Sequence, residues 1–247
     1  MPQSIDINCD MGEGMETDVL ILPFISSASI ACGYHAGNED TIKRTIELCL
    51  ENGVAAGAHP SFFDKENFGR KEQYLSAEEV YQLVGEQLYI FEKLASPMGC
   101  VMHHVKPHGA LYNMAANDRT LSNIVAKAVG DFDENLLVYG LCGSHFISEA
   151  AARGLRVANE VFADRSYQDD GTLTPRSQTG ALIEEDEKAL QQVLQMINTQ
   201  TVTAQSGNTF PIKAETICIH GDGAHAVSFA HTIHQYLKGH HIEIKTI

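Results

Sequence analysis

Near its middle the chain reads His103-His104-Val105-Lys106-Pro107-His108-Gly109-Ala110-Leu111-Tyr112-Asn113. The preceding residues, Cys100-Val101-Met102, form a short apolar run that is typical of a buried strand. Behind the stretch, Asp118 or the residue before it can cap a helix with one apolar face. Lys106 and His108 are therefore expected in a loop that leads from a strand to a helix. In parallel α/β proteins chemistry gathers in such loops, because the carboxyl ends of the strands open on one face.

The rest of the chain alternates short apolar runs with longer amphipathic runs. We expect strands at residues 5–8, 29–32, 54–58, 100–102, 136–141, 155–162, 216–219 and 242–247. Helices are expected between them, with Asn38 and the capping box at Ser76 as start signals and Gly53 as a stop. The segment 199–211 is polar and fits a small hairpin. This alternation indicates a parallel sheet of about seven strands, closed or nearly closed into a barrel, in one domain that covers residues 1–247.

Composition excludes several classes of protein. The 247 residues include 17 basic and 32 acidic side chains, so the net charge is -15, which repels phosphate backbones and disfavours nucleic-acid binding. The chain has no apolar run of the ~18 residues that a membrane span needs. Its first residues lack the basic and apolar segments of a signal peptide. Six cysteines without CxxC spacing indicate buried thiols in a reducing compartment, so we expect a cytoplasmic protein.

Polar side chains recur where the expected strands end. In a barrel these ends converge on one pocket, so side chains that are far apart in the sequence are expected to meet there. A lone histidine or aspartate at a strand end often only satisfies loop amides, but this explanation is poor for the whole set. The residues in these positions are Asp10, His35, His59, His103, Lys106, His108, Glu160, Asp164, His220 and Asp222.

The acidic residues that follow the first strand allow two interpretations. Asp10 and Glu13 are candidates for a general base pair or for Mg²⁺ ligands, while Asp10 can equally bind the amides of its own turn. Asp10 with His35 and His59 could form a metal triad of two imidazoles and a carboxylate. The chain has no HxxxH or HExxH spacing. We therefore expect no tightly bound transition metal.

Several cationic residues are candidates for binding an anionic group. Lys106 precedes a proline, where a buried ammonium can polarise a carbonyl or hold a phosphate; the alternative is a salt bridge to a loop carboxylate. Arg70, Arg165 and Arg176 are expected in loops on the same face, where they could clamp a carboxylate or phosphate. Gly221-Asp222-Gly223 opens a helix that could hold an anion, although the chain contains no GxxxxGK[ST] motif.

The residue sequences of these motifs, and their order along the chain, resemble those of the LamB/YcsF family. The central Val105 to Asn113 run is the most specific of them, and the match extends from Ile5 to the end of the chain. The other matching stretches are Asp6 to Glu13, Ala31 to Gly37, Gly57 to Pro60, Glu160 to Arg165 and His220 to Asp222.

The resemblance implies an irregular (β/α) TIM-like barrel of the glycoside hydrolase/deacetylase kind. It also implies ATP-dependent opening of 5-oxoproline to glutamate, with ATP and Mg²⁺ as cofactors and two further subunits as partners. The residues placed in catalysis are Asp10, Glu13, His35, His59, Lys106 and His108. The residues placed in binding of substrate or phosphate are Arg70, Glu160, Asp164, Arg165, Arg176, His220 and Asp222.

Two other functions remain open at this point. The fold kind and the histidine and aspartate content also fit a metal-dependent amide or polysaccharide deacetylase, which would hold zinc and would not use ATP. The missing phosphate-binding motif fits a non-catalytic subunit of a lactam-utilising complex.

Overall fold

The computed structural model describes residues 4–219, 221 and 226–247, and its central element is a closed parallel barrel. Strands β1, β2, β3, β4, β5, β6 and β9 pair in that order, and β9 pairs back with β1. The fold is therefore a seven-stranded, TIM-like α/β barrel, as the sequence predicts. The barrel strands are β1 (Ser4–Met11), β2 (Ser27–Ala31), β3 (Ala55–His59), β4 (His104–Val105), β5 (Leu137–Leu141), β6 (Arg156–Phe162) and β9 (Thr216–Ile219).

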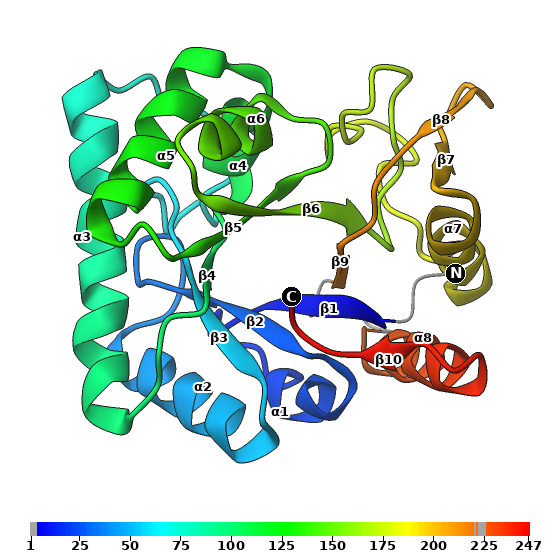
Figure 1. Cartoon of the computed structure of the whole chain (residues 1–247), viewed down its shortest axis with the longest axis horizontal. Coiled ribbons are helices and arrows are strands. Elements are labelled where there is room, and N and C mark those ends of the chain that lie inside the picture. Colours follow the sequence, from blue (N-terminus) through cyan, green and yellow to red (C-terminus); the bar gives the residue numbers. More distant parts are fainter. Residues whose placement is uncertain (1–3, 220, 222–225) are drawn as a thin grey trace.

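The helices lie around the outside of the strands (Figure 1). They are α1 (Asp18–Ile21), α2 (Glu39–Asn52), α3 (Ala77–Ala95), α4 (Gly109–Asn117), α5 (Arg119–Phe132), α6 (His145–Ala152), α7 (Asp186–Thr199) and α8 (Ala226–Gly239). Two short 3₁₀ turns extend the chain beyond helices: η1 (Leu22–Phe24) follows α1, and η2 (Ser96–Met98) follows α3. An antiparallel pair, β7 (Thr201–Thr203) and β8 (Thr209–Pro211), forms the expected hairpin.

Local sequence signals explain where the long helices begin and end. The Asn38 side chain accepts a hydrogen bond from the Thr41 amide at the start of α2, and Gly53 ends that helix with a φ of 67°. Ser76 and Glu79 form a reciprocal capping box at the start of α3. Each of these signals is visible in the sequence, and each lies where it was predicted.

The fourth strand begins four residues later than predicted. The predicted strand at residues 100–102 is a connecting segment, and β4 begins at His104. The prediction failed because it took the apolar run for a buried strand, whereas Val101 in this run is 84% exposed. As a result, His103 precedes β4 and lies at the amino end of the barrel, so its predicted place at a carboxyl end is wrong.

Two further boundaries differ from the prediction. The chain forms a separate helix, α4, directly after His108, and Asp118 then caps α5 by accepting from the amides of Thr120 and Leu121. The last strand, β10 (Glu243–Ile244), is only two residues long and pairs with the start of β1 outside the barrel.

The barrel interior is unusually polar. Alternate residues of a strand face opposite sides, so Ile7 and Cys9 pack against the helices while their neighbours face inward. At the amino end, Asp6 accepts hydrogen bonds from three hydroxyl groups, at 2.7 Å, 2.8 Å and 2.5 Å. We call this group the hydroxyl cluster; it consists of Asp6, Ser26, Ser27 and Thr216.

Above the hydroxyl cluster, His104 fills the middle of the barrel. It stacks on Tyr139 and lies 3.1 Å from the Ser29 hydroxyl. Gly57 leaves room for this ring, since a Cβ there would stand 2.5 Å from it. Described side chains thus fill the middle of the barrel, and the cleft described below lies at the carboxyl ends of the strands.

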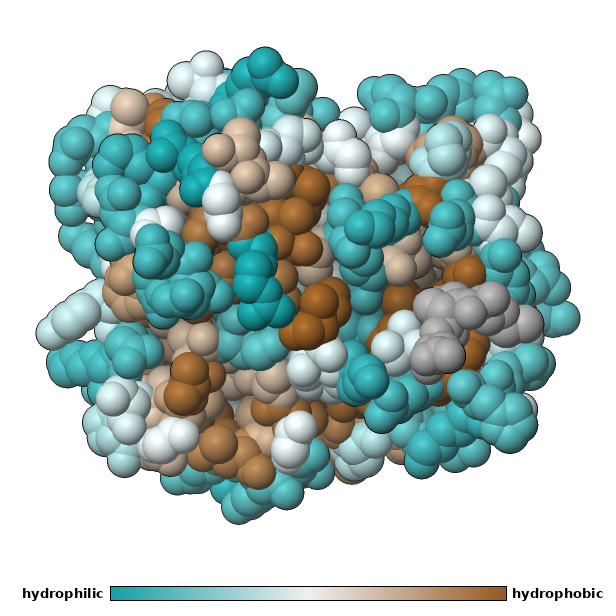
Figure 2. All heavy atoms as spheres, viewed as in Figure 1, coloured by the Kyte–Doolittle hydropathy of each residue, from teal (hydrophilic) through white to brown (hydrophobic). Residues whose placement is uncertain are grey.

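The outer surface carries no membrane-spanning feature among the described helices. None of them is both long and apolar enough to cross a bilayer. On the face in Figure 2, hydrophilic residues form most of the periphery, and hydrophobic residues gather nearer the middle. All six cysteines are free thiols, and five are buried, as the sequence analysis expects.

Candidate active site

A cleft of about 670 Å³ lies at the carboxyl ends of the barrel strands. Its floor comes from β1, β3 and the loop after β4, and its rim comes from the loops after β3 and β6. Such a position is where the active sites of TIM-like barrels lie. The sequence-predicted residues that line it are Asp10, Glu13, His59, Arg70, Lys106, His108, Arg165 and Arg176.

Lys106 is buried between two carboxylates at the base of this cleft. Its Nζ lies 2.8 Å from Asp10 Oδ1 and 2.6 Å from Glu160 Oε1. It also donates to Asn8 Oδ1 at 2.9 Å, and Tyr112 donates to the second oxygen of Glu160 at 2.6 Å. Burial alone would lower the pKa of Lys106, but the two carboxylates outweigh it and raise that pKa well above its ordinary value.

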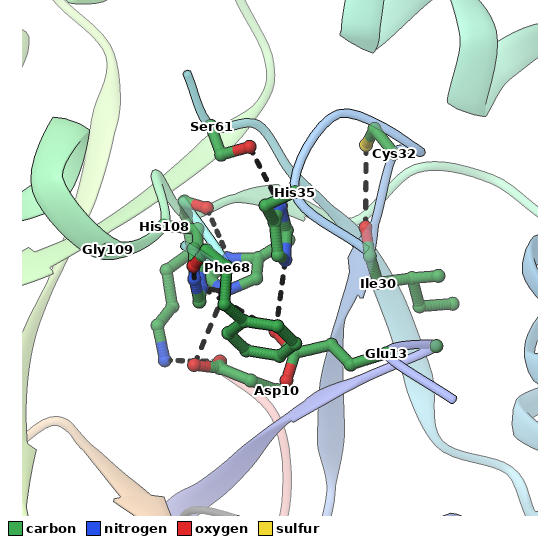
Figure 3. A network of polar contacts seen from close by, with 12 residues as sticks. Asp10, Glu13, Ile30, Cys32, His35, Ser61, Phe68, His108 and Gly109 are labelled. Carbon is green, nitrogen blue, oxygen red and sulfur yellow. Dashed lines mark hydrogen bonds and ion pairs between the residues drawn. The ribbon is translucent and has the colours of Figure 1, made fainter. Parts of the chain in front are cut away.

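We call Lys106, Asp10 and Glu160 the ion triad. Three histidines and one further carboxylate lie together beside it. His35 Nε2 lies 3.0 Å from Glu13 Oε1, and His108 Nδ1 lies 2.9 Å from His59 Nε2. His35 and His108 stack with their ring centroids 3.8 Å apart. Figure 3 shows His35 held between Ser61 on one side and Glu13 on the other. We call this group the histidine cluster; it consists of Glu13, His35, His59 and His108.

Asp10 borders the histidine cluster and links it to the lysine. One of its oxygens contacts Lys106, and the other lies 3.3 Å from His59 Nε2. The structure therefore adds Glu13 and His108 to the two histidines that the sequence suggested for a metal, and it places Asp10 next to them.

The loop after β3 folds over the cluster. Phe68 adopts a φ of 56°, which is uncommon for a residue other than glycine, and its carbonyl accepts a hydrogen bond from His108 Nε2 at 3.0 Å. The next residue, Gly69, has no side chain to collide with the histidines, because a Cβ there would stand 2.9 Å from both His35 and His108. The hydrogen bond from His108 and close packing at Gly69 thus hold this loop in contact with the cluster, despite the strained backbone of Phe68 (Figure 3).

Burial keeps two of these imidazoles neutral. It lowers the pKa of His35 to about 3, and nearby His59 acts in the same direction. Burial also lowers the pKa of His108 well below its ordinary value, with smaller contributions from His35 and His59. Both rings are therefore uncharged near neutral pH and present lone pairs rather than positive charge.

The three predicted arginines differ in what they can offer to a ligand. Arg165 lines the cleft, but its guanidinium donates to the carbonyls of Thr174 and Ala181 and so fastens its own loop. Burial lowers the pKa of Arg165 to about 10. Arg70 is exposed on the rim and stacks over Phe68 at 5.0 Å. Arg176 also lines the rim and makes no hydrogen bond or ion pair with another described residue.

The remaining predicted residues fall in different places. Glu160 is wholly buried beneath the cleft and acts on it through Lys106 and Tyr112. Asp164 follows β6 but is not among the described residues that line the cleft. His220 and Asp222 lie outside the described residues, although Gly221 between them lines the cleft.

Sequence reasoning missed the residues that support the histidines. Gln87 clamps the backbone of Ser61 from both sides, accepting from its amide at 2.9 Å and donating to its carbonyl at 2.8 Å. Ser61 in turn contacts His35. A signal for Gln87 was present, because it stands on the apolar stripe of α3 next to Val84 and Leu88. No comparable pattern marks Ser61.

The parallel barrel, with carboxylates and imidazoles buried at the carboxyl ends of its strands, places this chain in the class of TIM-like barrel proteins that carry their site at that face. Within that class, the model of the LamB/YcsF family matches residues 5–247, and the chain belongs to this family. One relative, the A subunit of 5-oxoprolinase from Tolumonas auensis, is 50% identical, covering 98% of this chain and 99% of that protein.

Solved structures agree with this assignment. The lactam utilization protein from Thermus thermophilus superposes with a TM-score of 0.92 at 38% identity, covering 99% of this chain and 100% of that one. The catalytic domain of a peptidoglycan N-acetylglucosamine deacetylase from Eubacterium rectale gives a TM-score of 0.54 at 12% identity, covering 99% of this chain and 88% of that one. The second likeness shows a shared fold alone.

Proposed function

We propose that this chain is the A subunit of an ATP-dependent 5-oxoprolinase, which hydrolyses 5-oxo-L-proline to L-glutamate together with two further subunits. The observation that carries the proposal is the 50% identity, over nearly the whole length of both chains, to the 5-oxoprolinase protein of Tolumonas auensis. The cleft supports it, because a volume of about 670 Å³ accommodates a small lactam and a phosphoryl group.

The chemistry requires activation of the lactam. An unstrained lactam is a poor electrophile, and transfer of a phosphoryl group from ATP to its oxygen makes the ring carbon reactive. Water then attacks that carbon, the C–N bond breaks, and glutamate, ADP and phosphate result. The chain has no phosphate-binding motif of the GxxxxGK[ST] type, so we assign nucleotide binding with Mg²⁺ mainly to the partners and ring opening to this cleft.

The residues of the cleft suit the second half of this reaction. Glu13 and Asp10 border open space beside the imidazoles and are placed to orient and deprotonate water, a role typically worth about 10²- to 10⁴-fold in rate. Arg70 and Arg176 on the rim are placed to hold the carboxylate of 5-oxoproline or a phosphoryl group. Lys106, engaged by two carboxylates, fixes Asp10 in position and offsets its charge.

The test is reconstitution with candidate partner subunits. Glutamate formation and ADP release are measured for the chain alone, for the partners alone, and for the mixture, with and without 5-oxoproline. We expect ATP-coupled glutamate formation only in the mixture. Full activity of the partners without this chain would contradict the proposal.

Two variants of the assay test the alternatives. A non-catalytic subunit predicts that alanine variants of the cleft still support turnover in the mixture, whereas a catalytic subunit predicts loss. An ATP-independent deacetylase predicts release of acetate from an acetamido sugar by the chain alone. The buried, costly arrangement of carboxylates and imidazoles favours the catalytic subunit, since such groups rarely persist without a role.

A further inference from the structure

The hydrogen bonds around His59 and His108 determine where their protons lie. His59 Nδ1 stands 2.6 Å from the Lys106 carbonyl, and His108 Nε2 stands 3.0 Å from the Phe68 carbonyl. A carbonyl oxygen only accepts, so each of these nitrogens carries the hydrogen. In neutral His108, Nδ1 is then a bare lone pair, and it faces His59 Nε2 at 2.9 Å.

The same reasoning applies to His35. The Ser61 hydroxyl donates to the Phe62 carbonyl at 2.9 Å, so it accepts from His35 Nδ1 at 2.8 Å. His35 Nε2 is therefore also a bare lone pair, and it faces the Glu13 carboxylate at 3.0 Å. An imidazole lone pair and a carboxylate at this range repel each other unless a proton or a metal ion lies between them.

The positions of the inward atoms suit a metal ion. The four ligand atoms of the histidine cluster all lie within 4.8 Å of one another, and three of the separations are 2.9 Å, 3.0 Å and 3.6 Å. Ligands held about 2.0–2.1 Å from a tetrahedral ion stand about 3.3–3.4 Å apart. Outer nitrogens that donate to backbone carbonyls are the usual support of metal-binding histidines, because they set the tautomer and the ring direction.

We propose that the histidine cluster binds one divalent transition-metal ion through three imidazoles and the Glu13 carboxylate, with Zn²⁺ as the best fit. Three nitrogens and one oxygen suit zinc and disfavour Mg²⁺, which prefers oxygen ligands.

The site opens toward the cleft. Glu13, His59 and His108 line the cleft, while His35 closes the rear and is only 1% exposed. In the proposed ring opening, water would join the ion as a fifth ligand at the cleft side, and Asp10, rather than Glu13, would be the base beside it. That role rests on the proposed function, whereas the binding of the ion does not.

The test measures metal binding directly, without ATP, substrate or partner subunits. The untagged chain is treated with a chelator and dialysed, then titrated with Zn²⁺ by calorimetry and with Co²⁺ by visible absorption. We expect one equivalent of each, strong tetrahedral Co²⁺ bands, and a higher melting temperature with Zn²⁺. Binding without 1:1 stoichiometry, or no Co²⁺ bands and no thermal shift, would overturn the proposal.

Variants locate the ion. His108→Gln should weaken Zn²⁺ binding by about 10²-fold or more, and Ser61→Ala, which removes only the support of His35, by about 10- to 100-fold. His231→Gln, an exposed histidine on α8, is the matched control and should bind as the wild type does. Equal binding by all three variants would place the metal elsewhere and refute the site. If His108→Gln does not fold, the wild-type Co²⁺ spectrum and Ser61→Ala still decide the question.

This experiment separates the two proposals. Stoichiometric binding without 5-oxoproline turnover in the reconstituted mixture would support the metal site and contradict the proposed function. Turnover of 5-oxoproline by protein that binds no metal would support the proposed function and contradict the metal site.

Discussion

Two buried polar clusters occupy opposite ends of the same barrel, and they are built on different rules. In the hydroxyl cluster at the amino end, every contact of Asp6 pairs a hydroxyl donor with a carboxylate acceptor. In the histidine cluster at the carboxyl end, imidazole nitrogens face one another and a carboxylate. The first arrangement needs nothing more, while the second calls for a proton, an ion or a substrate.

The difference separates a structural cluster from a functional one. Burial is similar in the two places, so burial of polar groups alone does not identify a site. What identifies it is a set of acceptors that face one another, positioned beside open space and supported by a strained loop. The account therefore predicts loss of stability from changes at the amino end and loss of turnover from changes at the carboxyl end.

The largest effect should come from Lys106, which tests whether the carboxyl end also carries structural charge. Lys106→Met leaves Asp10 and Glu160 buried without their counterion, so we expect a loss of about 3–5 kcal/mol in the free energy of unfolding. Turnover of the folded fraction should fall by about 10²-fold or more, because Asp10 loses its anchor. Denaturant unfolding and the reconstituted assay measure the two effects.

A surface lysine is the control for this change. Lys127 pairs with Asp131 on the exposed side of α5, and Lys127→Met should change stability by less than about 0.5 kcal/mol. Adding Glu160→Gln to Lys106→Met should recover part of the lost stability but not the turnover. A Lys106→Met protein as stable as the wild type would mean that the ion triad is not formed.

At the amino end, Asp6→Ala should have the opposite signature. It leaves the hydroxyls of Ser26, Ser27 and Thr216 without their acceptor, and we expect a loss of about 1–3 kcal/mol in stability. Specific activity per folded molecule should stay within about threefold of the wild type, since Asp6 is remote from the cleft lining. A tenfold drop in that activity would break the division between the two clusters.

Changes on the rim of the cleft should weaken substrate binding and leave the stability of the protein unchanged. Arg176→Ala removes a cation that makes no hydrogen bond or ion pair with other described residues, so the fold should be unaffected. Loss of one charge-assisted hydrogen bond to the substrate should raise KM for 5-oxoproline about tenfold, with kcat less changed. Arg44 is exposed on α2 and does not line the cleft, so Arg44→Ala is the control for loss of a positive charge. An unchanged KM would remove Arg176 from the binding site.

The smallest effect concerns the pH dependence of the amino end. Burial raises the pKa of Asp6, although hydrogen bonds from Ser26, Thr216 and Ser27 act to lower it. A carboxyl with a raised folded pKa contributes stability that is fully present below its unfolded pKa and is lost as the pH rises through the folded pKa. The stability advantage of the wild type over Asp6→Asn should therefore shrink as the pH rises above about 4, the pKa of an unperturbed aspartate. An advantage that grows with pH would contradict this.

Much of the fold was predictable because its signals are local. Most strand runs, the Asn38 and Ser76 caps and the hairpin turn depend on neighbours in the sequence, and these were placed correctly. The fourth strand was not, because β4 has only two residues and its apolar lead-in contains the exposed Val101. Nothing within the run distinguishes an exposed valine from a buried one.

The site was predictable as a set of residues but not as a set of contacts. The rule that strand ends converge brought Asp10, His59 and Lys106 to one cleft correctly. The partnership of Glu13 with His35 crosses two loops, and a spacing motif such as HxxxH cannot reveal ligands that come from four different segments. Geometry alone showed that the imidazoles turn their inward nitrogens toward one another.

Glu13→Gln tests whether the histidine cluster is arranged for function at the expense of stability. The amide nitrogen of glutamine can donate to His35 Nε2, where the carboxylate cannot, so the repulsion between acceptors is relieved. For chelator-treated protein we predict an unfolding free energy equal to or above that of the wild type, with glutamate formation in the reconstituted mixture lower by about 10²-fold or more. Reduced stability with normal turnover would contradict the account.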